Sequence, residues 1–547
     1  MRFSAKDRKR LLDEMEGEQL DLLVIGGGIT GAGIAWDAAS RGLSVGLVEK
    51  QDFAAGTSSR STKLIHGGLR YLKQMEIKLV REVGRERALL HERAPHIVLP
   101  KPMMLPIYEG GTYGKLASSI GLYLYDRLAG VKKEERRRIL SREETLKKEP
   151  LLTERGLKGS GLYVEYRTDD ARLTLEVMRT ASSLGAKTVN YAEAVSFLYE
   201  GDRMVGAKVR DRVSGESYRI RAREVVNAAG PWVDELRKRD GSLSGKRLHL
   251  TKGVHLVVPY ERLPLQQPIY FDIPDGRMVF AIPRGRTTYI GTTDTDYDGP
   301  IDSPEMTVED RDYLLEGVNH VFPKAGLKPE DVESGWAGLR PLIHEEGKSP
   351  SELSRKDEIF ESPTGLITIA GGKLTGFRKM AERVVDRVNR RLEKAGIHSF
   401  VPCRTDRLSI SGGADLGRDG FVHFRNEWVC RLKEGGLSQK RAEELIHLYG
   451  VHVEKVWERA GHSEDRLLKA QVEHAVEEEM AVAAADFLIR RTGDVYFHRY
   501  RAAGSAPLVL STMGEALGWD SFKAEEERAR LEREMLRTHP QPGPVGS

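Results

Sequence analysis

The fold is decided by the stretch DLLVIGGGITGAGIAWDAASRGLSVGLVEK, residues 21–50. Residues 21–25 are mostly apolar and predict a short strand, and the glycines between residues 26 and 31 predict a tight turn. Small residues then predict a helix that ends near Arg41, and residues 43–48 predict a second strand. Strand, glycine turn, helix and strand in this order form the unit that binds the pyrophosphate of a dinucleotide.

Three glycines and one acid give this unit its chemistry. Gly26, Gly28 and Gly31 match the GxGxxG spacing, which allows a close approach of the backbone to a pyrophosphate. The helix that begins near Ile29 is expected to point its N-terminal N–H groups at this anion. Glu49 follows Gly28 by 21 residues, where a carboxylate accepts hydrogen bonds from ribose hydroxyls and disfavours a 2′-phosphate. The motif alone does not distinguish NAD from FAD, because both contain adenosine diphosphate.

Two later segments favour FAD. Residues 224–230, EVVNAAG, end in small residues, as required where the backbone packs on a large cofactor. Residues 371–375, GGKLT, have the same character and directly precede a predicted helix with Met380 and Val384 on its apolar face. A helix N-terminus directed at the isoalloxazine ring would stabilise the negative charge of reduced flavin.

The rest of the chain predicts an α/β fold: a Rossmann-like FAD-binding domain with an inserted antiparallel-sheet substrate domain, plus an all-helical C-terminal domain. Strands are predicted at 254–258, 278–282 and 287–291, with a hairpin turn at 274–276, and the helical spacing of residues 475–491 is typical of a helix. The predicted domains are a helical N-terminal extension (1–20), the FAD-binding domain (21–400) with its interleaved substrate-binding sheet (mainly about 80–160 and 245–345), a helical C-terminal cap domain (401–535) and a disordered tail (536–547).

Composition excludes several classes of protein. The 547 residues contain 86 Lys and Arg against 82 Asp and Glu, a net charge of +4, which argues against a nucleic-acid binder. Two cysteines, Cys403 and Cys430, make no disulfide framework or CxxC motif, and no acidic, His or Cys grouping has the spacing of a metal site. The charged N-terminus is not a signal peptide, and no apolar stretch is long enough to span a bilayer. We therefore expect a cytoplasmic protein.

Longer blocks of sequence resemble one family, the FAD-dependent (aerobic) glycerol-3-phosphate dehydrogenases. They are spread in family order from about residue 21 to 495, so the resemblance covers nearly the whole chain. One position departs from it, because the family has Tyr where this chain has Phe377. The blocks are IGGGITGAGIAWD (25–37), SSRSTKLIHGGLRYL (58–72), TDDARL (168–173), NAAGPW (227–232), KGVH (252–255), IGTTD (290–294), GLRP (338–341), GGKLT (371–375) and DFLIRRT (486–492).

The resemblance implies that sn-glycerol 3-phosphate is oxidised to dihydroxyacetone phosphate by hydride transfer from C2 to N5 of FAD. It further implies that the electrons pass to a membrane quinone, ubiquinone or menaquinone, and that the enzyme is a homodimer. An enzyme without a membrane span would then be peripheral on the inner face of the cytoplasmic membrane. A candidate membrane contact is the aromatic and aliphatic segment 122–125, followed by basic residues 132, 133 and 136–138.

The substrate is a dianion with a hydroxyl to be deprotonated, so the site needs cations and a base. By resemblance, Arg340 and Lys373 are the main candidates for cations, and His66 and His255, which the residues do not rank, are the candidates for the general base. The predicted catalytic residues are thus His255, His66, Arg340 and Lys373. The predicted substrate-binding residues are Arg70, Tyr71, His255, Arg340, Arg355 and Lys373.

The same resemblance implies a larger set of residues around FAD. The predicted cofactor-binding residues are Gly26, Gly28, Ile29, Thr30, Gly31, Glu49, Lys50, Thr57, Ser58, Ser59, Lys63, Leu64, Ile65, His66, Gly67, Ala229, Gly230, Trp232, Asp294, Gly372, Lys373, Leu374 and Thr375.

Other functions stay open at this stage. The chain could be an oxidase that forms hydrogen peroxide, a flavin amine oxidase acting on an amino acid, an NAD-linked dehydrogenase, or a flavin-binding scaffold with vestigial catalytic residues. An amino-acid enzyme needs an Arg for the carboxylate but not the pair Arg340 and Lys373. A colourless protein would indicate NAD, and a yellow protein that glycerol 3-phosphate does not bleach would indicate the scaffold.

Overall fold

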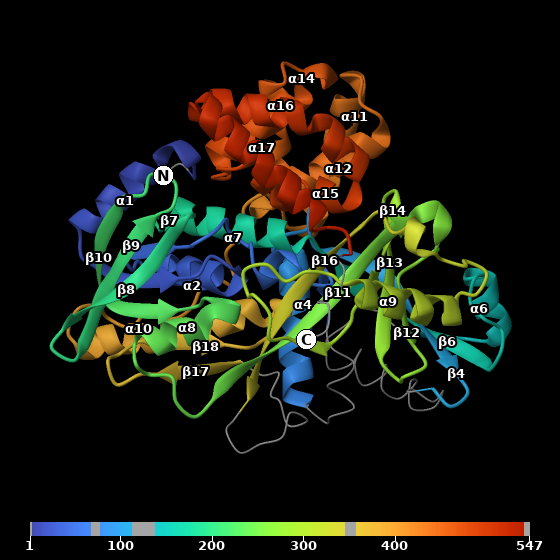
Figure 1. The fold of residues 1–547 in the computed structure, drawn as a ribbon, viewed down its shortest axis with the longest axis horizontal. Helices are drawn as coiled ribbons and strands as arrows, with labels where there is room; N and C mark the ends of the chain where they lie inside the picture. The colour runs from blue at the N-terminus through green and yellow to red at the C-terminus, as the bar shows by residue number, and fades with distance from the viewer. Residues whose placement is uncertain (1–2, 67–76, 112–136, 345–356, 541–547) are drawn as a thin grey trace.

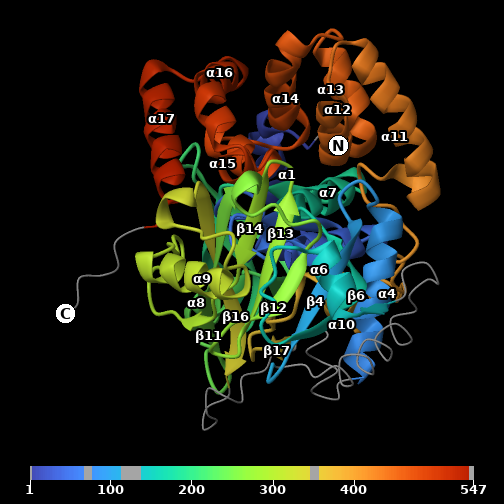
Figure 2. The same ribbon diagram turned by 90° about the vertical axis from the view of Figure 1, so that its right-hand side faces the viewer.

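Two β-sheets lie side by side, and a layer of helices covers one edge of both (Figures 1 and 2). The computed structural model describes residues 3–66, 77–111, 137–344 and 357–540. The first sheet lies near the N-terminal helix, the second lies beside it, and the helices of the last quarter of the chain form the upper layer in Figure 1.

The first sheet carries the dinucleotide unit. β1 pairs in parallel with β2 on one side and with β10 on the other, and β10 pairs in parallel with β18, so segments far apart in sequence meet at one edge. These pairings confirm the predicted strands near 21–25 and 43–48. β8 and β9 extend β10 as an antiparallel meander. The strands are β17 (Glu358–Glu361), β18 (Ile367–Ala370), β10 (Ser217–Asn227), β1 (Leu20–Ile25), β2 (Val45–Val48), β7 (Lys187–Val189), β8 (Ala192–Glu200) and β9 (Arg203–Asp211).

Helices pack against this sheet because its central strands are buried on both faces. Every residue of β1 and β2 is buried, as parallel strands between helices require. α2 (Ile29–Ser40) follows the glycine turn and packs between α7 (Asp170–Ser183) and α10 (Phe377–Lys394). α8 (Val233–Arg239) follows β10.

The second sheet is almost wholly antiparallel. The prediction of strands at 254–258, 278–282 and 287–291 is confirmed, and the predicted turn joins β12 to β13. One pair differs from the prediction of an antiparallel sheet, because β4 runs parallel to β12. The strands are β15 (Thr295–Asp296), β11 (Arg247–Pro259), β14 (Thr287–Gly291), β13 (Met278–Arg284), β12 (Ile269–Asp272), β4 (Leu99–Tyr108), β6 (Leu157–Arg167), β3 (Leu64–Ile65), β16 (Ser334–His344) and β5 (Arg138–Leu140).

Three helices accompany the second sheet, and one precedes the first. α4 (Ile77–Arg93), α6 (Arg142–Lys148) and α9 (Val308–Val321) connect or cover strands of the second sheet. α1 (Arg8–Gly17) buries Leu11, Leu12 and Met15.

The C-terminal layer is helical, but one predicted helix in it is wrong. The predicted helix 475–491 is interrupted: α14 ends at Glu478, Met480 has a φ of 51°, and a short π-helical turn (Asp486–Arg491) follows. The layer consists of α11 (Gly417–Glu434), α12 (Gln439–Tyr449), α13 (Val453–Arg459), α14 (Glu464–Glu478), α15 (Asp494–Phe497), α16 (Arg499–Leu517) and α17 (Ser521–Leu536).

The interruption has a physical cause in side-chain partners. The Glu479 carboxylate accepts a hydrogen bond from Arg172 of α7 at 2.6 Å. Asp486 caps the new turn, because its Oδ2 accepts hydrogen bonds from the backbone N–H groups of Val482 and Ala483 at 3.0 and 2.9 Å. These contacts outweigh the helix propensity of the alanine-rich segment.

Two further predictions concern the absence of a membrane-spanning helix and the disordered tail at residues 536–547. In residues 3–66, 77–111, 137–344 and 357–540, none of the helices has both the length and the apolar character of a membrane span. α17 continues to Leu536 and Thr538 is buried, and residues 541–547 of the predicted tail lie outside the described residues.

Candidate active site

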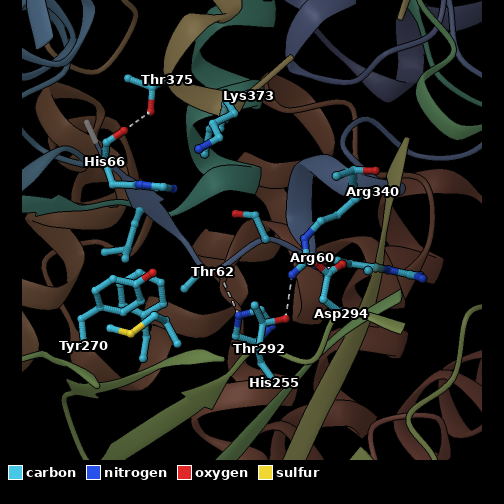
Figure 3. Close-up of a pocket in the computed structure, with 18 of the residues that line it drawn as sticks. Arg60, Thr62, His66, His255, Tyr270, Thr292, Asp294, Arg340, Lys373 and Thr375 are labelled. Atoms are coloured by element: carbon cyan, nitrogen blue, oxygen red, sulfur yellow. Dashed lines mark hydrogen bonds and ion pairs between the residues drawn. The ribbon is translucent and has the colours of Figure 1, made fainter. Parts of the chain in front are cut away.

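A cavity of about 580 Å³ lies between the two sheets (Figure 3). Its walls come from segments that are far apart in sequence: residues 57–66, the strands β11, β12 and β13, the end of β14, the middle of β16, and residues 372–375. Charged and polar side chains from these segments point into one space in Figure 3.

Arg340 forms one side of the cavity. It lies on β16, and its Nη1 donates to Asp294 Oδ1 at 3.0 Å and to the Thr293 carbonyl oxygen at 3.1 Å. Nη2 donates to Thr292 Oγ1 at 2.8 Å. Gly253 on the neighbouring strand allows this placement, because a Cβ there would lie 2.4 Å from Arg340 Nη2. The guanidinium is therefore held in one orientation while its side chain stays 30% exposed to the cavity.

Lys373 and His66 lie on the opposite side. Lys373 follows Gly371 and Gly372, both with a positive φ (73° and 84°), and precedes a short 3-10 turn. The hydroxyl of Thr375 donates to the His66 carbonyl oxygen at 3.2 Å, which fixes the two segments to each other. Burial, with the nearby charges of Lys373 and Arg87, lowers the pKa of His66 to about 3, so its ring is neutral near pH 7.

His255 forms the floor of the cavity. Its ring stacks on the Trp336 indole, with the centroids 4.8 Å apart and the planes at 12°, and it is 1% exposed. Nε2 lies 3.0 Å from Thr62 Oγ1, and Nδ1 has no hydrogen-bond partner in the described chain. Burial, and then the positive charges of Arg340 and Lys63, holds the pKa of His255 well below its usual range. The ring is thus a neutral, rigidly held proton acceptor.

The remaining wall is aromatic. Tyr270 and Phe280 stack with centroids 4.1 Å apart, from the hairpin of β12 and β13. Sequence reasoning missed four lining residues that the figure labels, Arg60, Thr62, Tyr270 and Thr292. Arg60, Thr62 and Thr292 stand inside blocks that the resemblance covers, so those blocks held the signal. Tyr270 had none, because only the strand pairing brings it to the cavity.

The glycine turn forms the dinucleotide end of the site. A Cβ at Gly31 would lie 1.9 Å from the Gly26 carbonyl oxygen, and one at Gly26 would lie 2.5 Å from the Ala228 carbonyl oxygen. Only glycine therefore permits the close packing of the turn on α2 and on the end of β10. The Ile29 N–H donates to Ser58 Oγ at 2.9 Å, which brings residues 57–59 to the N-terminus of α2.

Glu49 stands at the end of β2 beside this turn. Its Oε2 accepts a hydrogen bond from the Gly27 N–H at 2.7 Å, and burial raises its pKa. Lys50 Nζ lies 4.3 Å from the centroid of the Trp232 ring, and the buried Trp232 Nε1 has no hydrogen-bond partner in the described residues. These features fit a dinucleotide cofactor such as FAD. They are a glycine turn at the N-terminus of α2, the Glu49 carboxylate where a ribose is expected, and the indole N–H of Trp232, which has no hydrogen-bond partner in the described residues.

The predicted site residues thus fall into two adjoining groups. The cavity itself contains Thr57, Leu64, His66, His255, Asp294, Arg340, Gly372, Lys373, Leu374 and Thr375. The second group lies in the turn and the start of α2, directly after β2, in residues 58–65 and directly after β10: Gly26, Gly28, Ile29, Thr30, Gly31, Glu49, Lys50, Ser58, Ser59, Lys63, Ile65, Ala229, Gly230 and Trp232. The predicted residues Gly67, Arg70, Tyr71 and Arg355, and the candidate membrane contact at 122–125 and 132–136, lie outside the described residues.

Lys63 and Phe377 make contacts that explain their roles in the fold. Lys63 is buried, and its Nζ forms an ion pair with Asp170 Oδ1 at 2.6 Å. Phe377 is fully buried against α2, since a Cβ at Gly33 would lie 2.9 Å from its ring. The missing hydroxyl at Phe377 therefore concerns the packing of α10 on α2 and not the cavity.

Family models match most of the chain. The model described as FAD dependent oxidoreductase matches residues 21–379, and the model described as C-terminal domain of alpha-glycerophosphate oxidase matches residues 403–524.

Individual proteins match over nearly the whole length. An aerobic glycerol-3-phosphate dehydrogenase of Bacillus subtilis (strain 168) is 53% identical over 542 residues, 97% of each chain. The enzyme of the same name from Staphylococcus aureus (strain USA300) is 49% identical over 541 residues, again 97% of each chain. The crystal structure of the glycerol-3-phosphate dehydrogenase from Bacillus halodurans complexed with FAD superposes with a TM-score of 0.85 at 45% identity, covering 100% of this chain and 99% of that one.

Proposed function

The chain belongs to the FAD-dependent aerobic glycerol-3-phosphate dehydrogenases, and on that premise we propose that it oxidises sn-glycerol 3-phosphate to dihydroxyacetone phosphate and passes the electrons to a membrane quinone. The chain is an oxidoreductase and FAD is its cofactor. The substrate, the roles of individual residues and the electron acceptor are the proposal.

The glycine turn and Glu49 are proposed to hold the adenosine diphosphate part of FAD. The N–H groups at the start of α2 would bind the pyrophosphate, and Glu49 would accept hydrogen bonds from the ribose hydroxyls. Bound FAD supplies a two-electron acceptor for the hydride that leaves C2 of the substrate. Residues 372–375, which line the cavity, would hold the substrate beside the flavin.

Arg340 and Lys373 are proposed to bind the phosphate. A phosphate ester near neutral pH carries close to two negative charges, and the guanidinium fork of Arg340 matches two phosphate oxygens. Asp294, Thr292 and Thr293 already orient that fork, so little side-chain entropy is lost when the phosphate binds. Arg70, Tyr71 and Arg355 stay further candidates on the resemblance alone.

His255 is proposed to take the proton of the C2 hydroxyl. A general base must be unprotonated and within hydrogen-bond reach of that hydroxyl. Burial keeps the His255 ring neutral, and Trp336 and Thr62 fix its plane. His66 is the alternative base, because it is also neutral and lies on the side of Lys373.

One observation carries the proposal: Arg340, Lys373 and the neutral, buried His255 line a single cavity that adjoins the dinucleotide end. In the proposed function, this arrangement supplies a phosphate anchor, a base and a place beside the flavin. A small dianionic alcohol is the substrate class that uses all three.

Anaerobic bleaching of the flavin tests the substrate and the base together. Glycerol 3-phosphate is expected to bleach the wild-type flavin, whereas glycine and D-amino acids are not. His255→Ala is expected to slow the bleaching by at least about 10²-fold, the usual effect of losing a general base, and His66→Ala serves as the matched variant. Near-normal bleaching in His255→Ala with slow bleaching in His66→Ala would move the base to His66.

The electron acceptor and the location need separate measurements. Turnover with a quinone analogue that greatly exceeds turnover with oxygen supports the dehydrogenase, and the reverse result supports an oxidase that forms hydrogen peroxide. We propose a homodimer that binds the inner face of the cytoplasmic membrane. Light scattering of the purified protein and co-sedimentation with anionic liposomes at low salt test these two points.

A further inference from the structure

The π-helical turn Asp486–Arg491 of the C-terminal layer reaches the loop that follows Glu49. The loop is formed by residues 50–55, and its centre, Asp52, is fully buried. Four donors surround the Asp52 carboxylate. Arg490 Nε donates to Oδ2 at 2.5 Å and Arg491 Nη1 donates to the same oxygen, while Arg491 Nη2 and Asn190 Nδ2 each donate to Oδ1 at 3.0 Å.

The same loop is packed directly on the glycine turn. The Ala54 N–H donates to the Gly27 carbonyl oxygen at 3.0 Å. A Cβ at Gly27 would lie 2.7 Å from the Phe53 ring, so loop and turn are in close contact. The Gln51 N–H donates to Glu49 Oε1 at 2.8 Å. The conformation of residues 50–55 therefore fixes the position of both the turn and the Glu49 carboxylate.

This loop needs an outside partner to keep its shape. Ala54 has a φ of 62°, a left-handed conformation that costs a residue with a Cβ about 1–2 kcal/mol. Such a conformation persists only where surrounding contacts determine it. The loop is held at several points, among them the Tyr191 N–H, which donates to the Gln51 carbonyl oxygen at 2.8 Å, and the Phe53 ring, which stacks on Phe3. Asp52 is its buried charged anchor, and two of the three partner side chains of Asp52 belong to the C-terminal layer.

The arginine pair is itself held in place. Arg490 Nη2 donates to Asp486 Oδ1 at 2.6 Å, and Arg491 Nη2 donates to the Glu479 carbonyl oxygen at 2.7 Å. Burial raises the pKa of Asp52, but the two guanidiniums outweigh that effect and leave its pKa below the usual range. The carboxylate is therefore ionised, and the contact is a buried cluster of paired charges.

We propose that Arg490 and Arg491 are positioning residues for FAD, which act through Asp52 on the glycine turn and on Glu49. The C-terminal layer then helps to shape the dinucleotide site, although Arg490 and Arg491 lie more than 400 residues after Asp52 in the sequence. The inference depends on the proposed function only in taking the turn and Glu49 as the FAD site, and it is independent of the substrate and of the electron acceptor.

The rate of FAD release from diluted holoenzyme, followed by the rise of free flavin fluorescence, tests the proposal. Arg491→Lys keeps the charge but loses the two-pronged contact with Asp52. We expect it to release FAD at least ten times faster than the wild type. Asp52→Asn keeps the shape of the side chain and is expected to do the same, so it decides the question if Arg491→Lys gives no soluble protein.

Arg501→Lys is the matched control. Arg501 also makes a two-pronged contact with a carboxylate of the C-terminal layer, through Asp494 at 2.5 and 3.0 Å, and none of its hydrogen bonds or ion pairs within the described residues reaches residues 50–55. It should leave FAD release unchanged. Equal FAD release in the two lysine variants would overturn the proposal. Failure of the proposed function would instead appear in the wild type, as a protein without flavin or one that glycerol 3-phosphate does not bleach.

Discussion

Replacing Arg340 with alanine tests whether one guanidinium anchors the phosphate of the substrate. Arg340 lines the cavity, and three contacts with Thr292, Thr293 and Asp294 orient it before any ligand binds. If the phosphate lies on this fork, the variant loses charge-assisted hydrogen bonds but keeps FAD and the base. The effect should therefore appear in substrate binding and not in flavin content.

The size of the effect follows from the kind of contact. A hydrogen bond to a charged group contributes about 1.5–3 kcal/mol, and every 1.4 kcal/mol changes a dissociation constant about tenfold. We expect Arg340→Ala to weaken binding of glycerol 3-phosphate by about 10- to 150-fold. Arg340→Lys keeps the charge but not the fork, so it should fall between the wild type and the alanine variant.

Stopped-flow bleaching of the flavin at increasing substrate concentration separates binding from the limiting rate. Arg277→Ala is the control, because Arg277 also lines the cavity but its side chain is 48% exposed and pairs with Asp275 at the surface. It should change the apparent dissociation constant less than threefold, as expected for a weak exposed ion pair. Unphosphorylated glycerol provides a second control, since its bleaching should not depend on Arg340.

One result refutes the reasoning. If Arg340→Ala binds glycerol 3-phosphate as tightly as the wild type, the phosphate lies elsewhere in the cavity. A loss of affinity for glycerol equal to that for glycerol 3-phosphate would also refute it, because the residue would then act on the alcohol or on the shape of the site.

Two further predictions concern the glycine turn and the buried side chain of His96. Gly31→Ala places a Cβ 1.9 Å from the Gly26 carbonyl oxygen, so the purified variant should lack the flavin band near 450 nm, whereas Gly17→Ala, which meets no atom within 4 Å, should keep it. His96 is fully buried, and burial lowers its pKa to about 3, so the unfolded chain takes up its proton below about pH 6.5 while the folded chain does not, and stability falls as the pH falls. When the pH is lowered from 7 to 5, the free energy of unfolding of His96→Phe should therefore fall by roughly 2 kcal/mol less than that of the wild type. Urea titrations at the two pH values measure this difference, and an equal fall in both proteins would contradict the prediction.

Local patterns were sufficient to predict the dinucleotide unit. The strand, turn, helix and strand of residues 21–48 are decided by neighbours in sequence, since apolar runs, glycines and small residues alternate there. The helix predicted at 475–491 is wrong for the opposite reason. Its break depends on Arg172 of α7, which lies more than 300 residues away in sequence, and no local pattern shows such a partner.

The site shows the same division. Arg340, Lys373 and both histidines could be predicted because glycine and proline neighbours and the resemblance mark their segments. Lys63 was expected at the cofactor, and its ion pair with Asp170 was not visible in the sequence. Tyr270 reaches the cavity through strand pairing, and Asp52 meets Arg491 through the packing of two layers. Both are consequences of tertiary structure.

With the roles proposed for them, the placement of His255 and Arg340 on neighbouring strands would connect phosphate binding to the strength of the base. In the register of β11 and β16, Arg340 faces Thr251 and Trp336 faces His255. After burial, the positive charge of Arg340 is the largest cause that lowers the pKa of His255. If the phosphate binds Arg340 as proposed, it would add negative charge on the same side and offset that repulsion, so the pKa of His255 would rise when the substrate is bound. On these proposed roles, the ring would be a weak proton acceptor in the empty cavity and a stronger one in the loaded cavity, which would tie proton removal to the presence of a phosphorylated substrate.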